Sequence, residues 1–204
     1  MKTHWVIAGI AVVGIGALAV LAAAVLWWGI YVQRWEGPMV YRVASVASLP
    51  AARFAGTPIL LRDYLDDVES LKTYLASEEA VQAKLTREIT DDDRKQALER
   101  LLQEAATKEL ADIRKISITD EQVQEAIQTE FVSSGGDQAA FEAYLQKNFR
   151  WTLQDFEKHV VRPVLLERLL TASYAADHEN DLEAFQTYLD DRLKKDDVVR
   201  YVKF

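Results

Sequence analysis

Side chains that could carry out chemistry are few and widely spaced in this sequence. Histidines occur only as His4, His159 and His178, and there is no cysteine. A zinc site would therefore need carboxylates at spacings that no common zinc motif supports. The sequence also lacks a nucleophile elbow, a phosphate-binding loop and a dinucleotide-binding fingerprint. It thus predicts a protein that is not an enzyme and that has no metal site, no cofactor and no small-molecule substrate.

The polar clusters have structural explanations that need no ligand. The neighbouring acids 66–67 project about 100° apart on a helix and indicate a solvated face rather than an acid–base pair. Thr90 followed by three aspartates is typical of a helix start, because these groups bind free N–H groups at the positive end of the dipole. Residues 134–137 (Ser-Gly-Gly-Asp) follow no strand and predict a turn between helices. His159 is expected to be a partly buried structural histidine.

An uncharged apolar run from Trp5 to Val32 is the strongest single feature of the chain. About 20 helical residues cross the hydrocarbon layer of a bilayer, so the run predicts a transmembrane helix over residues 5–32, with lipid as its partner. Tryptophans at both ends favour the headgroup level. The alternative is a cleaved signal peptide, for which residues 17–19 (Ala-Leu-Ala) supply a small-x-small pattern, although apolar residues continue beyond it.

The short head of the chain gives the expected orientation. Residues 1–4 form a tail that we expect in the cytoplasm, since such a short tail is typical of a signal-anchor. The rest would then lie outside the cytoplasm, in a periplasm or the extracellular space, and the absence of cysteine is compatible with this. The chain of 204 residues has a net charge of −8, which argues against nucleic acid as a partner.

Behind a linker over residues 33–39, the sequence predicts one mainly helical domain over residues 40–204. Apolar residues recur every three or four positions, which is typical of amphipathic helices. These stripes fall in 61–75, 98–113, 123–131, 141–149, 156–165 and 182–194. Residues 39–46 are interpreted as a strand and 48–56 as a loop. The alternating C-terminal segment 198–204 is expected to pair with residues 40–46, giving a two-stranded β ribbon that joins the N- and C-terminal segments of the domain.

The order of these features resembles the SurA-type and PrsA-type extracytoplasmic chaperones. Residues 56–65 (GTPILLRDYL) resemble the family's entry into its first helix, with Ala55 in place of the usual asparagine and 49–54 as an apparent insertion. Residues 116–123 (ISITDEQV) and the later pattern from Phe141 to Phe156 also resemble this family. The resemblance covers most of residues 40–204, and its motifs are helix caps and core positions.

The resemblance implies a chaperone that holds unfolded or exported polypeptides beside the membrane. Family members commonly carry a parvulin prolyl isomerase module before the C-terminal helix, but residues 171–181 are far too few for one. Isomerase activity is therefore not implied. Apolar segments of a client would bind a concave apolar patch, and an acidic rim would favour basic segments. The candidate peptide-binding residues are Phe131, Tyr144, Phe149 and Trp151, around the Gly-Gly turn.

Other interpretations stay open at this stage. Aromatic residues at helical spacing are usually core residues, so each of these four could be buried instead. The domain could also be a structural or adaptor subunit that docks one fixed membrane or envelope protein. A third possibility is a degenerate sensor without catalysis.

Overall fold

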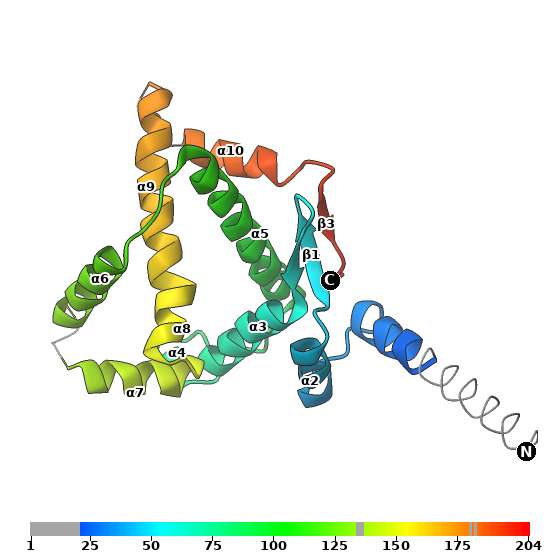
Figure 1. The fold of residues 1–204 in the computed structure, drawn as a ribbon. Helices are drawn as coiled ribbons and strands as arrows, with labels where there is room; N and C mark the ends of the chain where they lie inside the picture. Colours follow the sequence, from blue (N-terminus) through cyan, green and yellow to red (C-terminus); the bar gives the residue numbers. More distant parts are fainter. Residues whose placement is uncertain (1–20, 134–136, 180, 182) are drawn as a thin grey trace, which may run out of the picture.

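The computed structural model describes residues 21–133, 137–179, 181 and 183–204, with the side chains of 130–133 outside this part. Most of the described chain is helical, as the sequence predicts, and a small sheet completes the fold (Figure 1). After a helical segment at 21–31, the elements are α2 (Pro38–Val46), β1 (Pro50–Phe54), β2 (Thr57–Leu60), α3 (Leu61–Leu75), α4 (Glu78–Gln82), α5 (Asp91–Arg114), α6 (Asp120–Ser133), α7 (Gln138–Phe149), α8 (Leu153–Phe156), the π-helical turn η1 (Glu157–Val161), α9 (Arg162–Asp177), α10 (Ala184–Arg192) and β3 (Val198–Arg200).

The sheet has three antiparallel strands in the order β2-β1-β3. A two-residue turn joins β1 to β2, with φ of 47° at Ala55 and 84° at Gly56. Two consecutive residues with positive φ are typical of the tight hairpin turn that matches strand twist. β3 pairs with the other edge of β1, with Ala52 opposite Arg200. The C-terminal segment therefore does pair with an early strand of the domain.

The early strand is not the one that the sequence analysis predicts. Residues 38–46 form helix α2, and the predicted ribbon between 40–46 and the C-terminal segment is wrong. Pro38 stands in the first turn of α2, where its missing N–H costs nothing, and Val40 and Ala44 lie on one buried face. A strand would have placed Arg42 on that same face. The true partner, β1, lies in the stretch interpreted as a loop and an insertion.

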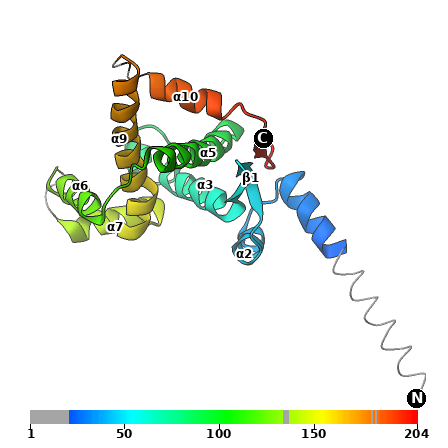
Figure 2. The same cartoon turned by 45° about the horizontal axis from the view of Figure 1, so that its top comes forward.

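Helix α5 crosses the centre of the domain and packs against α3, α9, α10 and β1. Its start is the predicted one: the hydroxyl of Thr90 accepts from the N–H of Asp93, and the Asp93 carboxylate accepts from the N–H of Thr90 at 2.8 Å. Helix α6 and the helical segment at 21–31 lie at opposite ends of the molecule, at left and right in Figures 1 and 2.

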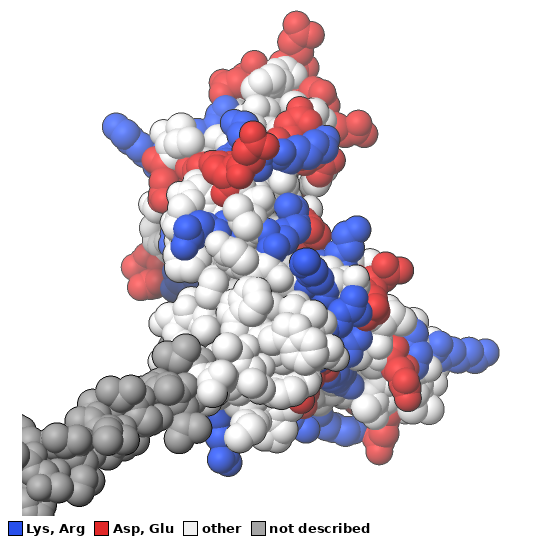
Figure 3. All heavy atoms as spheres, turned by 90° about the vertical axis from the view of Figure 1, so that its right-hand side faces the viewer, with Lys and Arg blue, Asp and Glu red and all other residues white. Residues whose placement is uncertain are grey.

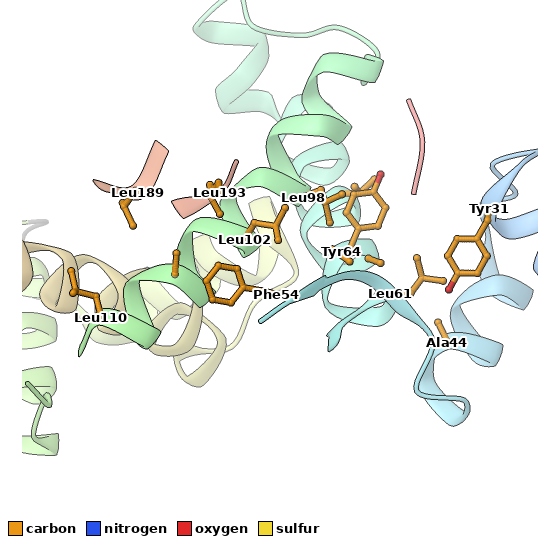
Figure 4. Close-up of a cluster of buried hydrophobic side chains, with 14 of the residues drawn as sticks. Tyr31, Ala44, Phe54, Leu61, Tyr64, Leu98, Leu102, Leu110, Leu189 and Leu193 are labelled. Atoms are coloured by element: carbon orange, nitrogen blue, oxygen red, sulfur yellow. The ribbon is translucent and has the colours of Figure 1, made fainter. Parts of the chain in front are cut away.

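The larger hydrophobic cluster, here called the main core, joins α2, α3, α5, α10 and the sheet (Figure 4). Leu98 and Leu102 of α5 are fully buried in it, with Phe54 of β1 beside them. The guanidinium of Arg192 lies 4.2 Å from the centre of the Phe54 ring and is only 5% exposed. It also binds Glu109 at 2.6 Å and Asp197 at 2.8 Å, so a buried charge locks α10 to α5 and to the entry of β3.

A separate cluster, here called the small core, holds α6 against η1. It consists of Val123, Ile127 and Val161, with Phe141 and Phe156 among the half-buried residues around it. The π-helical turn η1 ends immediately before α9, which has Pro163 in its first turn. Because proline cannot donate a backbone hydrogen bond, a local irregularity is expected there, and the sequence predicts a kink or a break at this position.

The helical segment at 21–31 is continuous with the folded domain. Its last residues, Ile30 and Tyr31, are 5% and 6% exposed and belong to the main core. Between residue 21 and the C-terminus, no helix of the described part combines the length and hydropathy needed to cross a bilayer. The first sixteen positions of the predicted anchor, residues 5–20, lie outside the described residues.

Candidate functional site

Aromatic rings from three elements form one continuous stack. Tyr74 of α3 stacks on Phe149 at the end of α7, with ring centroids 5.3 Å apart and planes 3° apart. Phe149 stacks on Trp151 at 5.0 Å, and Trp151 stacks on His159 of η1 at 5.4 Å. Such face-to-face contacts at about 5 Å fall in the range of favourable aromatic pairs. The stack brings together residues that are 85 positions apart in the sequence.

Local backbone geometry places Trp151 at the corner of this stack. Helix α7 ends at Phe149, and the next residue, Arg150, turns the chain with a φ of 60°. Thr152 then caps α8, with its N–H donating to the Asp155 carboxylate at 2.9 Å. Between the two helix ends, the indole N–H of Trp151 donates to the hydroxyl of Ser70 at 2.8 Å. The indole is therefore fixed on α3 rather than free to rotate.

The stack forms one wall of a groove of about 570 Å³ between α3, η1 and the start of α2. Apolar surface comes from Phe149, Trp151 and Leu65. Charged groups of both signs surround it: the carboxylates of Glu36, Asp66, Glu69 and Asp155, and the cations of Lys72, Arg150 and Lys158. Several of these are paired, with Arg150 at 3.0 Å from Glu69 and Lys72 at 2.5 Å from Glu36. The rim is mixed rather than purely acidic.

An ion pair between a buried carboxylate and a partly exposed arginine lies next to His159. The Asp67 carboxylate, 9% exposed, accepts from the Nε of Arg100 at 3.1 Å and lies 3.7 Å from the Nδ1 of His159. Burial raises the pKa of Asp67 although Arg100 opposes this, and burial lowers the pKa of His159. The imidazole is 11% exposed and packs against Trp151. This fits the structural role predicted for His159.

The structure brings three of the four candidate peptide-binding residues together. Phe149 and Trp151 are half-buried and line the groove. Tyr144 is 41% exposed, and its ring meets the edge of Phe149 at 6.1 Å. Phe131 belongs to α6, but its side chain lies outside the part of the chain that the structure describes. The sequence could not show that Tyr74 and His159 complete the stack, because both come from distant segments.

A second groove, of about 530 Å³, separates α6 from η1 and α9. Its apolar walls are Ala126 of α6 and a run of residues from the end of α8 onward: Phe156, Val160, Val161, Val164, Leu165 and Leu169. The helical spacing of Phe156, Val160, Val164 and Leu165 predicts that these side chains face inward. Val164 is nevertheless 46% exposed and Leu169 36% exposed, because α6 covers only part of this stripe. The spacing correctly predicts an apolar face, but that face is less buried than expected.

Both grooves expose apolar side chains, and the first has aromatic rings in its wall and charged groups at its edge. A groove with aromatic walls and polar edges is a common form of binding site. Within the ranges that the structure describes, no group of histidines and carboxylates is arranged to hold a metal ion.

Comparison with known proteins agrees with the sequence resemblance. Residues 1–170 match the SurA-like N-terminal domain, most of the chain, and no parvulin domain is matched. No curated protein matches the chain. No solved structure matches it either. The matched region contains every lining residue of both grooves and the whole aromatic stack. This chain belongs to the family of SurA-like N-terminal domains.

Proposed function

We propose that this protein is a membrane-anchored chaperone that holds unfolded or newly exported polypeptides outside the cytoplasm, without prolyl isomerase activity. The observation that carries the proposal is the groove walled by Phe149 and Trp151, in a chain of a chaperone-type family. Exposed apolar surface in a folded protein usually marks a site of interaction. Unfolded clients expose the apolar side chains that such a groove binds.

The groove is suited to binding client polypeptides regardless of their amino-acid sequence. Its rings offer flat apolar surface to any aliphatic or aromatic side chain, and such contacts are non-directional. The mixed rim of Lys158, Asp155 and Arg150 offers ion pairs to acidic and basic segments alike. Since exposed ion pairs contribute little, roughly 0–1 kcal/mol, affinity would come from the apolar wall and would stay moderate. Moderate affinity allows a client to leave.

The location follows from the N-terminal apolar run. Residues 5–32 would span the membrane once, with residues 1–4 in the cytoplasm and the folded domain on the other side. The proposal includes no isomerase activity because the connection between the last two helices is short: α9 ends at Asp177 and α10 begins at Ala184. A connection this short cannot hold a catalytic module of that kind.

An aggregation assay tests the proposal. The full chain, reconstituted in lipid nanodiscs, should suppress aggregation of denatured citrate synthase and of reduced lactalbumin at near-stoichiometric ratio. Trp151→Ala should weaken suppression of both clients, whereas Ile113→Ala should not. Ile113 is the matched control because it is 67% exposed and lies at the far end of α5. Absence of suppression by the unmodified protein would overturn the proposal.

Photo-crosslinking provides a test that does not depend on the stability of the Trp151 variant. Benzoylphenylalanine in place of Tyr144, which is 41% exposed beside Phe149, should crosslink to several unrelated clients. The same group in place of Ile113 should not. Capture of a single envelope protein at position 144, with no effect on aggregation, would support the adaptor interpretation and contradict the chaperone proposal.

A further inference from the structure

Helix α2 has two apolar faces, only one of which the folded domain covers. Val40 and Ala44 are each 5% exposed and pack into the main core. Met39 and Val46 share the outward side of the helix, seven residues apart, and are 75% and 89% exposed. Arg42 lies on this outward side as well and is exposed. A helix that is apolar on both sides needs a second apolar environment.

The segment that precedes α2 carries exposed tryptophans. Trp27, Trp28 and Trp35 are 59%, 50% and 44% exposed. Trp35 is held in place by Gly29. The backbone N–H of Trp35 donates to the carbonyl of Gly29 at 2.9 Å, and a Cβ at Gly29 would come within 2.4 Å of the Trp35 ring. In Figure 3 the surface of the described part next to the grey segment is mostly white, and most of the charged side chains in this view lie farther from it.

The segment between the two helices is fastened to the domain. The Tyr31 hydroxyl donates to the carbonyl of Pro50 at 2.8 Å. Glu36 accepts from Lys72 at 2.5 Å and from Arg94 at 2.7 Å, which ties the segment to α3 and α5. Arg34 pairs with Asp91 at 2.9 Å. The helical segment at 21–31 and the domain therefore hold one fixed orientation.

The length of the apolar run sets the height of α2 relative to a bilayer. A helix over residues 5–32 would be about 42 Å long, whereas the hydrocarbon layer is about 30 Å thick. The last turns, with Trp27 and Trp28, would then lie at the headgroup level, which tryptophan favours. Since α2 packs against Ile30 and Tyr31, it would lie at that level too.

We infer that the folded domain sits on the bilayer surface, with Met39 and Val46 of α2 and the ring of Trp35 in the interfacial layer. The partner is phospholipid: apolar side chains meet the acyl boundary, and the Arg42 guanidinium meets a lipid phosphate. Tyr41 and Pro38 of the same helix line the groove walled by Phe149 and Trp151, here called the aromatic groove. The groove would thus open directly beside the membrane. This inference rests on the anchor that forms part of the proposed function.

Single cysteines test the inference in the full chain, which has none of its own. Met39→Cys and Val46→Cys would each carry a bimane label, in phosphatidylcholine vesicles containing a lipid with a nitroxide near its headgroup. Leu21→Cys, at a position 63% exposed, reports on the anchor. Ile113→Cys, at a position 67% exposed on α5, is the matched control. All four positions are exposed, so labelling should leave the fold intact.

The inference predicts a loss of fluorescence at positions 39, 46 and 21, with none at 113. Quenching at 21 alone would overturn the seating of the domain and leave the anchor standing. No quenching at 21 would overturn both. Quenching at all four positions would indicate general adsorption and would also overturn the inference. A Met39→Asp/Val46→Asp variant, labelled at Trp35→Cys, should lose quenching relative to the same label without the two aspartates.

Discussion

The main core and the small core hold the same domain together in different ways. The main core has Leu98 and Leu102 surrounded by the strands and by helices α2, α3, α5 and α10. The buried Arg192 of α10 pairs with Glu109 of α5 and with Asp197 just before β3. In the small core, one face of α6 rests on η1 through Val123, Ile127 and Val161. Elements with few buried contacts open at lower free energy than the whole domain. We therefore expect the groove beside α6, here called the α6 groove, to widen more easily than the aromatic groove, whose α3 wall belongs to the main core.

This difference suggests a division of roles within the proposed chaperone. The aromatic groove has walls on α3, which belongs to the main core, and its Trp151 is tied to Ser70. The α6 groove has one wall that only the small core restrains. Because a rigid groove loses little order on binding, it favours affinity for single client side chains. A groove with a movable wall can adapt to clients of different bulk.

Truncation in the main core should have the largest effect. Leu102→Ala removes a fully buried side chain from the centre of α5. It should lower the free energy of unfolding by about 3 kcal/mol, through lost apolar burial and the cavity that remains. Chemical denaturation monitored by circular dichroism measures this loss. A cost below about 1 kcal/mol would contradict the rigidity ascribed to the main core.

The same type of truncation in the small core should act locally. Ile127→Ala, at a site 2% exposed, should lower the opening free energy of α6 by about 2 kcal/mol while the global unfolding midpoint changes little. Hydrogen exchange followed by mass spectrometry would show faster exchange in residues 120–133 alone. Equal acceleration in α5 would mean that the two cores unfold as one unit, and the comparison would fail.

Low pH should destabilise the main core by protonating Asp93 in the N-terminal cap of α5. The Arg87 guanidinium and the N–H and hydroxyl of Thr90 hold the pKa of the Asp93 carboxyl well below its usual range. Asp93 thus stabilises the fold above its ordinary pKa of about 4, and this stability is lost as pH falls through the lowered value. Asp93→Asn should cost about 1 kcal/mol at pH 7 and flatten the acid slope.

Denaturation series at pH 7, 4 and 3 would check this expectation. The parent chain should lose more stability than Asp93→Asn across that interval. Parallel slopes would show that other carboxylates dominate acid unfolding and that the cap contributes only its neutral hydrogen bonds.

The smallest effect should come from His159, on the wall of the aromatic groove. Burial first, and then Lys158, lower its pKa, while Asp67 opposes them. The lowered pKa means that the folded protein favours the neutral imidazole, so its contribution is present above the ordinary pKa of about 6.5 and is lost as pH falls through the lowered value. His159→Phe should remove this decline. Thermal unfolding between pH 7.5 and 5.5 measures it, and an unchanged slope in the variant would contradict the assignment.

Local signals in the sequence predicted local structure well. The cap at Thr90 is where the sequence predicts it, because a cap depends on residues three positions apart, and Thr119 and Thr152 begin helices with the same spacing. The C-terminal strand was also predicted. Residues 38–46 were not, since a short run of valines and alanines has similar spacing in a helix and in a strand. The strand β1 was not predicted either, because the residues that bury it come from distant parts of the chain.

The candidate site was predictable only in part for the same reason. Phe149 and Trp151 are close in sequence, and their proximity to a turn suggested a shared surface. Tyr74 and His159 join them only because α3 and η1 pack on either side, and nothing in their own neighbourhoods indicates this. The groove beside α6 was missed because periodic apolar spacing predicts an apolar face, not what covers it.

The position of β3 has a consequence for biosynthesis. β1, the central strand, is made early, but one of its two edges stays open until residues 198–200 have left the ribosome. Arg192, which covers the Phe54 ring, and its partner Asp197 are made shortly before β3. The domain therefore cannot complete its fold before residue 200 has been translated, and a polypeptide interrupted earlier would expose the unpaired edge of β1 to other nascent chains.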